Sequence, residues 1–154
     1  MQTGYPFHYQ TLCELAEERQ FSMPSTQAVG QLLRTLVASK PAGRFLELGT
    51  GMGLSLAWMI DGMDASAQLL SLDNDPELIE LVSGIIKDKR VRIETHDGDQ
   101  WLQEYSGPSF DLIFADTWPG KYRFLDEALA LLKVGGLYVI DDMTEQENWP
   151  EGHA

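Results

Sequence analysis

The sequence FLELGTGMGLS at residues 45–55 contains the pattern that decides the fold of this chain. Its apolar first half predicts a short strand, and a helical pattern begins at Leu54, directly after three alternating glycines. Glycines at a strand-to-helix turn let bare backbone N–H groups approach a ligand closely. The carboxylate of Glu47, just before the turn, would repel a phosphate. The loop is therefore predicted to bind a cationic or hydroxyl-rich ligand.

Short apolar runs alternate with helical patterns along the rest of the chain. The predicted strands are Arg44–Leu48, Gln68–Leu72, Val91–Thr95, Asp111–Ala115 and Leu137–Ile140. Helices are predicted at 8–20, from the N-cap Ser25 to Lys40, at Leu54–Ile60, at Pro76–Ile86, around Trp101 and at Lys121–Leu132, the last ended by the segment 133–136. Continuous apolar strands are typical of a parallel sheet buried on both faces, so we expect an α/β, Rossmann-like, doubly wound, mostly parallel sheet.

Length and charge limit the classes of function. The 154 residues fit a single domain, 1–154, and the net charge of −13 argues against nucleic acid as a partner. The single cysteine, Cys13, suits a reducing compartment, which predicts a cytoplasmic protein. The first residues lack the pattern of a signal peptide, and no apolar run approaches the ~20 residues that span a bilayer, so no membrane partner is expected.

Acidic side chains follow the predicted strands. They are Glu47, Asp73, Asp97, Asp99, Asp116, Asp141 and Asp142. A single aspartate at such a position is commonly a helix N-cap. Because the carboxyl ends of parallel strands meet at one edge of a sheet, we expect these acids to converge there. So many carboxylates need a cation, a metal ion, or hydroxyl and amino groups as ligand.

The spacing of the glycines narrows the ligand. A dinucleotide loop would need glycine in place of Leu54 or Leu56, and a phosphate loop would need a lysine that is absent here. An acid at the end of the second strand, Asp73, reaches the ribose hydroxyls of an adenosine bound across the first loop. The pattern Glu-x-Gly-x-Gly-x-Gly is instead that of S-adenosylmethionine-dependent methyltransferases.

From about Ser25 to Met143 the chain resembles the class I methyltransferases, and among them the small-molecule O-methyltransferases akin to catechol O-methyltransferase. The motifs are FLELGTGMGLS, LLSLDNDPE, HDGDQWL, FDLIFADTW and LLKVGGLYVIDDM. The resemblance implies the strand order 3-2-1-4-5, with two helices in 1–40 ahead of a cofactor-binding core in 44–142. It also implies methyl transfer from S-adenosylmethionine, most simply to an oxygen of a small molecule.

The resemblance implies specific cofactor contacts. The glycines would approach the methionine portion, Ser55 would hold its carboxylate, and Glu47 would lie near its amino group or orient the loop. Asp73 would bind ribose, and Gly98 with Asp99 would contact the adenine, unless Asp99 caps the helix at Trp101. The full set is Glu47, Gly49, Thr50, Gly51, Gly53, Ser55, Asp73, Asn74, Gly98, Asp99 and Asp116.

The family's metal ligands and base are matched incompletely. Asp116, Asp141 and Asp142 correspond to an Asp-Asp-Asn triad and would hold Mg²⁺ or Ca²⁺, or else Asp116 and Asp141 order the cofactor rim. Proline, Pro119, stands where the catechol enzyme has its lysine. Lys121 is the nearest replacement, or lies on a solvated helix. The predicted catalytic residues are thus Asp116, Asp141 and Lys121, with Trp118 as a wall of the substrate pocket.

The sequence leaves open how the sheet is completed and which reaction the chain performs. The family's sheet has two further strands, so here the fifth strand is expected at an exposed edge, completed by a second copy in a homodimer or by a longer chain. One rival function is an aminopropyltransferase, which Tyr122 and Tyr138 keep open although the sequence shows no tyrosine-rich polyamine pocket. The others are a non-catalytic cofactor-binding module and, less compatible with the glycines, a nicotinamide dehydrogenase.

Overall fold

The computed structural model describes residues 4–21 and 26–143. Its helices are α1 (Tyr9–Glu18), α2 (Gln27–Ala38), α3 (Leu54–Gly62), α4 (Pro76–Ile85), α5 (Gly98–Glu104) and α6 (Leu125–Ala130). Its strands are β1 (Arg44–Leu48), β2 (Gln68–Asp73), β3 (Val91–Thr95), β4 (Phe110–Ala115) and β5 (Leu132–Ile140). Within the described ranges, no helix is both long enough and apolar enough to cross a membrane.

The five strands form one parallel sheet in the order β3-β2-β1-β4-β5, which confirms the predicted fold. β1 lies at the centre, and Leu48 at its end pairs with Leu72 of β2 and Ala115 of β4. Successive strands are added to one side of β1 up to β3 and to its other side from β4 onward, so the strand order reverses between β1 and β4. Ligands of such sheets bind outside the carboxyl ends of the strands at this point. The loop at residues 49–53 lies there.

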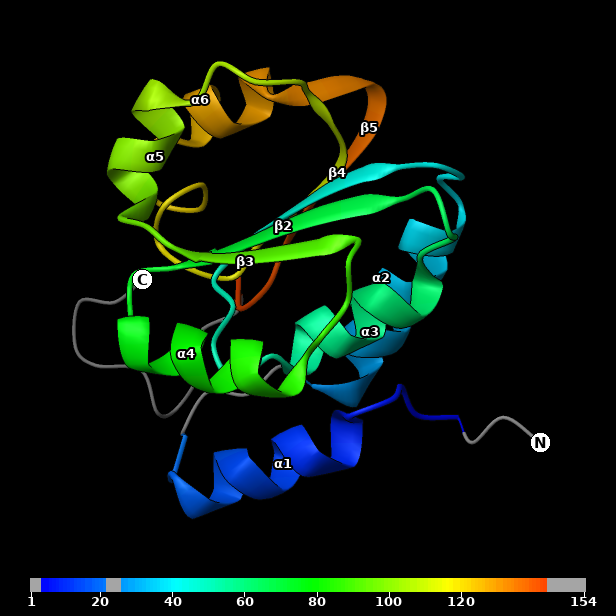
Figure 1. Cartoon of the computed structure of the whole chain (residues 1–154). Coiled ribbons are helices and arrows are strands. Elements are labelled where there is room, and N and C mark those ends of the chain that lie inside the picture. Colours follow the sequence, from blue (N-terminus) through cyan, green and yellow to red (C-terminus); the bar gives the residue numbers. More distant parts are fainter. Residues whose placement is uncertain (1–3, 22–25, 144–154) are drawn as a thin grey trace.

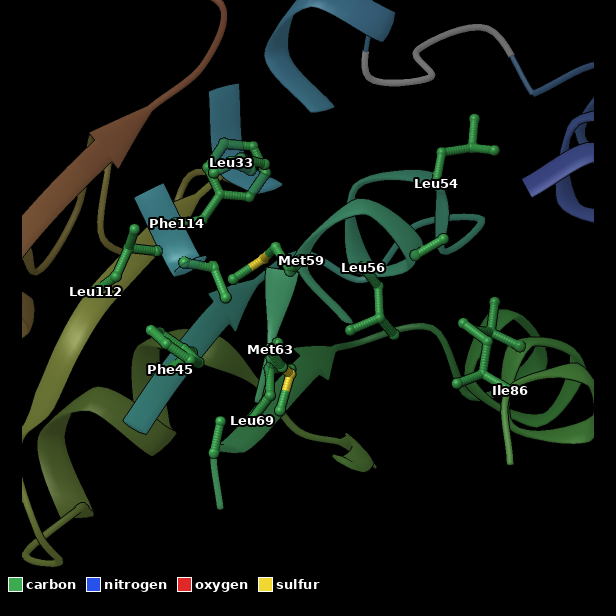
Figure 2. Packing of buried hydrophobic residues seen from close by; sticks show 14 of the residues in the cluster. Leu33, Phe45, Leu54, Leu56, Met59, Met63, Leu69, Ile86, Leu112 and Phe114 are labelled. Atoms are coloured by element: carbon green, nitrogen blue, oxygen red, sulfur yellow. The ribbon is translucent and has the colours of Figure 1, made fainter. Parts of the chain in front are cut away.

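Helices cover both faces of the sheet. In Figure 1, α5 and α6 lie on one face, and α1 to α4 lie on the other. β1 contributes to both cores because successive side chains of a strand point to opposite faces: Phe45 belongs to the larger cluster, and Leu46 and Leu48 to the smaller one. Figure 2 shows Phe45 in the larger cluster, together with side chains of α2, α3, β2 and β4.

The predicted helix 121–132 is wrong at both ends. The backbone instead makes a tight turn over residues 118–123, α6 is limited to Leu125–Ala130, and β5 begins at Leu132. Phe124 has a positive φ of 55°, which interrupts the helix that the local apolar spacing favours, and Gly120, with a φ of 78°, lies in the turn before it. The segment 133–136, expected to end the helix, lies inside β5 as an irregularity, because Phe110 pairs with Leu132 while Leu112 pairs with Leu137.

Side chains cap three of the helices. Thr26, and not Ser25, which is outside the described residues, accepts a hydrogen bond from the N–H of Val29 at the start of α2. Asp75 caps α4, and Asp97 caps α5 by accepting from Gln100. The residues after Met143, a polar stretch of the sequence that contains Trp149, also lie outside the described residues. Within the described sheet β5 is an edge strand, as expected.

Candidate functional site

The loop after β1 is held in a conformation that only glycine adopts readily. Gly49, Gly51 and Gly53 have φ of 105°, 53° and 83°. The N–H groups of Gly49 and Thr50 both donate to the carbonyl of Leu72, at 2.8 and 3.0 Å, so the loop is tied to the end of β2. A Cβ on Gly49 would come within 2.2 Å of Thr117 Cγ2, so the loop after β4 closely covers this position.

Glu47 lies beneath the loop and not on its surface. Its side chain is fully buried, and it accepts hydrogen bonds from the hydroxyls of Ser55 and Ser71, each at 2.6 Å. Thr50 joins the same network through a 2.7 Å hydroxyl–hydroxyl contact with Ser71. Thr50 and Ser55 are themselves buried, so three of the residues predicted for the cofactor site connect β1, β2 and α3 under the loop.

Burial changes the acidity of this carboxyl. Removal from water raises the pKa of Glu47 to about 8, because the charged form loses its hydration. The hydrogen bonds from Ser55 and Ser71 oppose the shift, and the nearby charges of Asp116 and Asp73 add to it. Glu47 is therefore mainly protonated at neutral pH and acts as a neutral strut for the loop.

Asp73 connects the loop to β2 from the other side. One carboxylate oxygen accepts from the N–H of Gly51 at 2.9 Å, and the other accepts from the N–H of Asp75 at 3.1 Å. Each oxygen has a second lone pair, and Asp73 lines a cavity at the carboxyl edge of the sheet. Since Asp75 and not Asp73 caps α4, Asp73 is available to a ligand in that cavity.

The cavity has a volume of about 260 Å³ and lies over the ends of β1, β2 and β3. Of the predicted cofactor residues, Gly49, Asp73, Asn74 and Gly98 line it. Sequence reasoning did not assign His96, Thr117 or Arg123 to the site, and it placed Trp118 on a substrate pocket. The complete lining is Leu48, Gly49, Leu72, Asp73, Asn74, His96, Asp97, Gly98, Thr117, Trp118, Pro119 and Arg123.

Asp99 is engaged with a neighbouring segment. It forms an ion pair with Arg123, Nε to Oδ2 at 2.9 Å, and Asp97 performs the capping role that had been the alternative for Asp99. Arg123 could not be recognised in the sequence, because its partner lies 24 positions earlier in another segment.

The three predicted metal ligands are brought together. One carboxylate oxygen each from Asp116, Asp141 and Asp142 lies within 4.8 Å of the others, and all three residues are half-buried. Asp116 follows β4 and its N–H donates to the carbonyl of Leu48, whereas Asp142 has a φ of 55° and its N–H donates to Asp141. Three hard oxygen donors at this spacing fit a small divalent cation.

Lys121 lies beside this group although the helix predicted for it is not formed. Its ammonium donates to the backbone carbonyl of Asp142 at 3.1 Å, and this contact is partly buried. The lysine therefore reaches the aspartate cluster from the 118–123 turn and not from a solvated helix face.

Comparisons with known proteins agree with this arrangement. A protein named "Putative O-methyltransferase" from Mycobacterium sp. strain JLS is 31% identical to this chain, and the match covers 75% of this chain and 55% of the relative. Its namesake from strain KMS is also 31% identical, and that match covers 81% of this chain and 61% of the relative. The chain thus spans little more than half the length of these relatives.

Solved structures share the fold. The O-methyltransferase from Bacillus cereus in complex with SAH superposes with a TM-score of 0.72 at 20% identity, over 81% of this chain and 61% of that one. TomG, the Streptomyces achromogenes O-methyltransferase involved in tomaymycin synthesis, in complex with SAM, superposes with a TM-score of 0.73 at 21% identity. The match covers 91% of this chain and 66% of TomG. The family model described as "O-methyltransferase" matches residues 7–148. This chain therefore belongs to the O-methyltransferase family.

Proposed function

We propose that this chain binds S-adenosylmethionine in the cavity at the carboxyl edge and takes part in methyl transfer to an oxygen of a small molecule. The observation that carries the proposal is the meeting of Gly49 and Asp73 in one cavity, with the aspartate cluster beginning at Asp116, next to the lining residue Thr117. A phosphate ligand is disfavoured there by Asp73 and Asp97, whereas ribose hydroxyls suit these acceptors.

Within this proposal the predicted cofactor residues divide into two groups. Gly49, Asp73, Asn74 and Gly98 line the cavity and are proposed to contact the cofactor. Glu47, Thr50 and Ser55 are proposed to support the loop from beneath, because their polar groups are buried and hydrogen-bonded to one another or to Ser71. Gly51 and Gly53 are proposed to let the loop backbone approach the methionine portion, and Asp116 is proposed to lie on the side of the transferred methyl group.

The aspartate cluster fits a magnesium ion, held by Asp116, Asp141 and Asp142. When bound, such an ion supplies Lewis-acid stabilisation to an oxygen that loses its proton. Lys121 is proposed to take that proton in its neutral amine form, since its Nζ reaches the aspartate cluster at the carbonyl oxygen of Asp142, 3.1 Å away. The neighbouring carboxylates of the cluster keep the acceptor end of the site negative, which suits the sulfonium of the methyl donor.

Calorimetry with S-adenosylhomocysteine tests the cofactor. We expect binding by the wild-type chain and weaker binding by Asp73→Ala. Asp64→Ala is the matched control, since Asp64 likewise accepts from two backbone N–H groups, those of Ala42 and Ser66, but is not among the residues that line the cavity. Absence of binding at millimolar ligand would refute the proposal. Cofactor binding without methyl transfer to a broad panel of acceptors would favour a non-catalytic module.

An aminopropyltransferase receives less support from the geometry. Its candidate tyrosine Tyr138 is buried enough that its pKa rises to about 12, and its hydroxyl donates to the carbonyl of Gly120. This hydroxyl is therefore committed to the 118–123 turn, and a polyamine would have to displace that hydrogen bond.

For partners, we propose a small-molecule acceptor and a homodimer formed along the edge of β5, in a cytoplasmic protein. The support for the dimer is the position of β5 at the edge of the described sheet, where unpaired backbone groups can pair with another strand. Sedimentation velocity tests it: a concentration-dependent dimer is expected, and a monomer at all concentrations would contradict it.

A further inference from the structure

The segment from Trp118 to Arg123, called here the 118–123 turn, forms one wall of the cavity. The carbonyl of Trp118 accepts from the N–H groups of Lys121, Tyr122 and Arg123, at 3.1, 2.8 and 3.1 Å. Pro119 and Arg123 form an isolated backbone bridge across the turn. The turn is therefore closed by its own hydrogen bonds, and it presents Trp118, Pro119 and Arg123 to the cavity.

Two contacts attach this turn to the β5 side of the molecule. The hydroxyl of Tyr138 in β5 donates to the carbonyl of Gly120, and the ammonium of Lys121 donates to the carbonyl of Asp142. Gly120 permits the close approach, because a Cβ there would come within 2.8 Å of the Tyr138 hydroxyl oxygen. Neither contact reaches across the cavity.

The attachment on the opposite side is made by Arg123. Its guanidinium pairs with Asp99 in the first turn of α5, at 2.9 Å, and lies 5.5 Å from the centre of the Trp118 ring. Next to it, Pro119 packs so tightly on Gly98 that a Cβ on that glycine would be 2.8 Å from Pro119 Cβ. The ion pair thus holds the tryptophan wall against the helix that follows β3.

We propose that Arg123 is a positioning residue of the cofactor cavity, which acts by fastening Trp118 and Pro119 to α5 through Asp99. The proposal rests on the proposed function, in that the cavity is taken to hold S-adenosylmethionine. It assigns Asp99 an indirect part in binding, in place of a direct contact with adenine. Loss of the pair releases the wall and widens the cavity between the ends of β3 and β4.

The ion pair is an unremarkable one for stability. Its side chains are 48% and 27% exposed, and such pairs contribute little to the free energy of unfolding. Lys133 and Asp111, at 3.0 Å and 46% and 23% exposed, form a closely matched pair at the other end of β4. The two pairs should therefore resemble each other in their effect on stability and differ in their effect on the cavity.

The experiment measures S-adenosylhomocysteine affinity by calorimetry for the wild type, Arg123→Ala, Asp99→Asn, the double variant and the control Lys133→Ala. We expect a loss of affinity of about fivefold to tenfold in Arg123→Ala, the combined size of an exposed ion pair and a cation–π contact, and a smaller loss in Asp99→Asn, which keeps the cation–π contact. The double variant should bind no more weakly than Arg123→Ala, and Lys133→Ala should bind like the wild type. Arg123→Lys should give an intermediate affinity, because it keeps the charge but loses the planar contact with Trp118.

The outcomes separate the two claims. Wild-type affinity in Arg123→Ala would overturn the positioning role and leave the proposed function standing. A loss confined to Asp99→Asn, or additive losses in the double variant, would also overturn it, because Asp99 would then contact the cofactor itself. No binding by the wild type would overturn the proposed function, and with it this inference. Urea unfolding of each variant checks that Arg123→Ala and Lys133→Ala are equally folded.

Discussion

Replacement of the buried Glu47 by glutamine should make the stability of the protein less dependent on pH. The glutamine amide has the shape of the protonated acid, and it can accept from one serine while donating to the hydroxyl oxygen of the other. It therefore preserves the contacts with Ser55 and Ser71, both 2.6 Å in the native structure, without a group that ionises. Near pH 5, where Glu47 is protonated in the folded protein, the two proteins should have similar stability.

The magnitude follows from the pKa of Glu47. Burial raises it from an ordinary 4.5 to about 8, so between these two values the folded chain binds a proton that the unfolded chain has released. The contribution of Glu47 to the free energy of unfolding is largest below pH 4.5, decreases as the pH rises from 4.5 to about 8, and stays at its lowest value above that. At about 1.4 kcal/mol per unit, the total loss is about 5 kcal/mol, which is a large part of the stability of a domain.

Urea unfolding of both proteins between about pH 5 and pH 9 measures this difference. The stability of Glu47→Gln relative to the wild type should rise across the window and then level off. Glu77→Gln serves as the control, because its side chain is 71% exposed and should show no such trend. Parallel curves for Glu47→Gln and the wild type would refute the assignment of Glu47 as a buried, neutral strut.

Three further predictions concern the cap, the loop and the metal ligands. Asp75→Ala should cost about 1 kcal/mol in urea unfolding by removing the N-cap of α4, whereas the exposed Glu80→Ala should cost much less; equal costs would contradict the capping role. Gly49→Ala should lower the free energy of unfolding by about 2 kcal/mol or more, because φ is 105° and the new Cβ would lie 2.2 Å from Thr117 Cγ2. An unchanged midpoint of urea unfolding would contradict this strain. Saturating Mg²⁺, at about 100 times its Kd, should stabilise the wild type by about 2.7 kcal/mol in thermal unfolding and leave Asp141→Ala unchanged; an equal shift in both would place the ion elsewhere.

The alternation of apolar runs was sufficient to predict the α/β fold class. Strands buried on both faces appear in the sequence as continuous apolar segments, and the five segments form a parallel sheet, in the order that the family resemblance implied. The helix predicted at 121–132 failed because its apolar spacing is a local signal, while Tyr138 and Asp99 fix the 118–123 turn from distant parts of the chain. No pattern within the turn itself reports these partners.

Only part of the candidate site could be predicted from the sequence. Sequence position indicated which residues gather at the carboxyl edge, and this applies to Asp73 and to the three clustered aspartates. Sequence position did not indicate which face of β1 carries Glu47. Both faces of this central strand are covered by helices, so the buried pairing of Glu47 with Ser55 depends on the packing of α3 against the sheet.

The irregular first half of β5 limits how this protein can aggregate. Only Leu137–Ile140 continue the regular pairing with β4, while the segment 133–136 departs from it and holds Val134 fully out in solvent. A bulged, twisted stretch is a poor template for another strand, so cross-β growth along the whole edge is disfavoured. The strand pairing of the proposed homodimer is therefore confined to Leu137–Ile140, beside the aspartate cluster, whose negative charge opposes the addition of further acidic strands. The same residues that are proposed to serve catalysis would thus also act as gatekeepers of solubility.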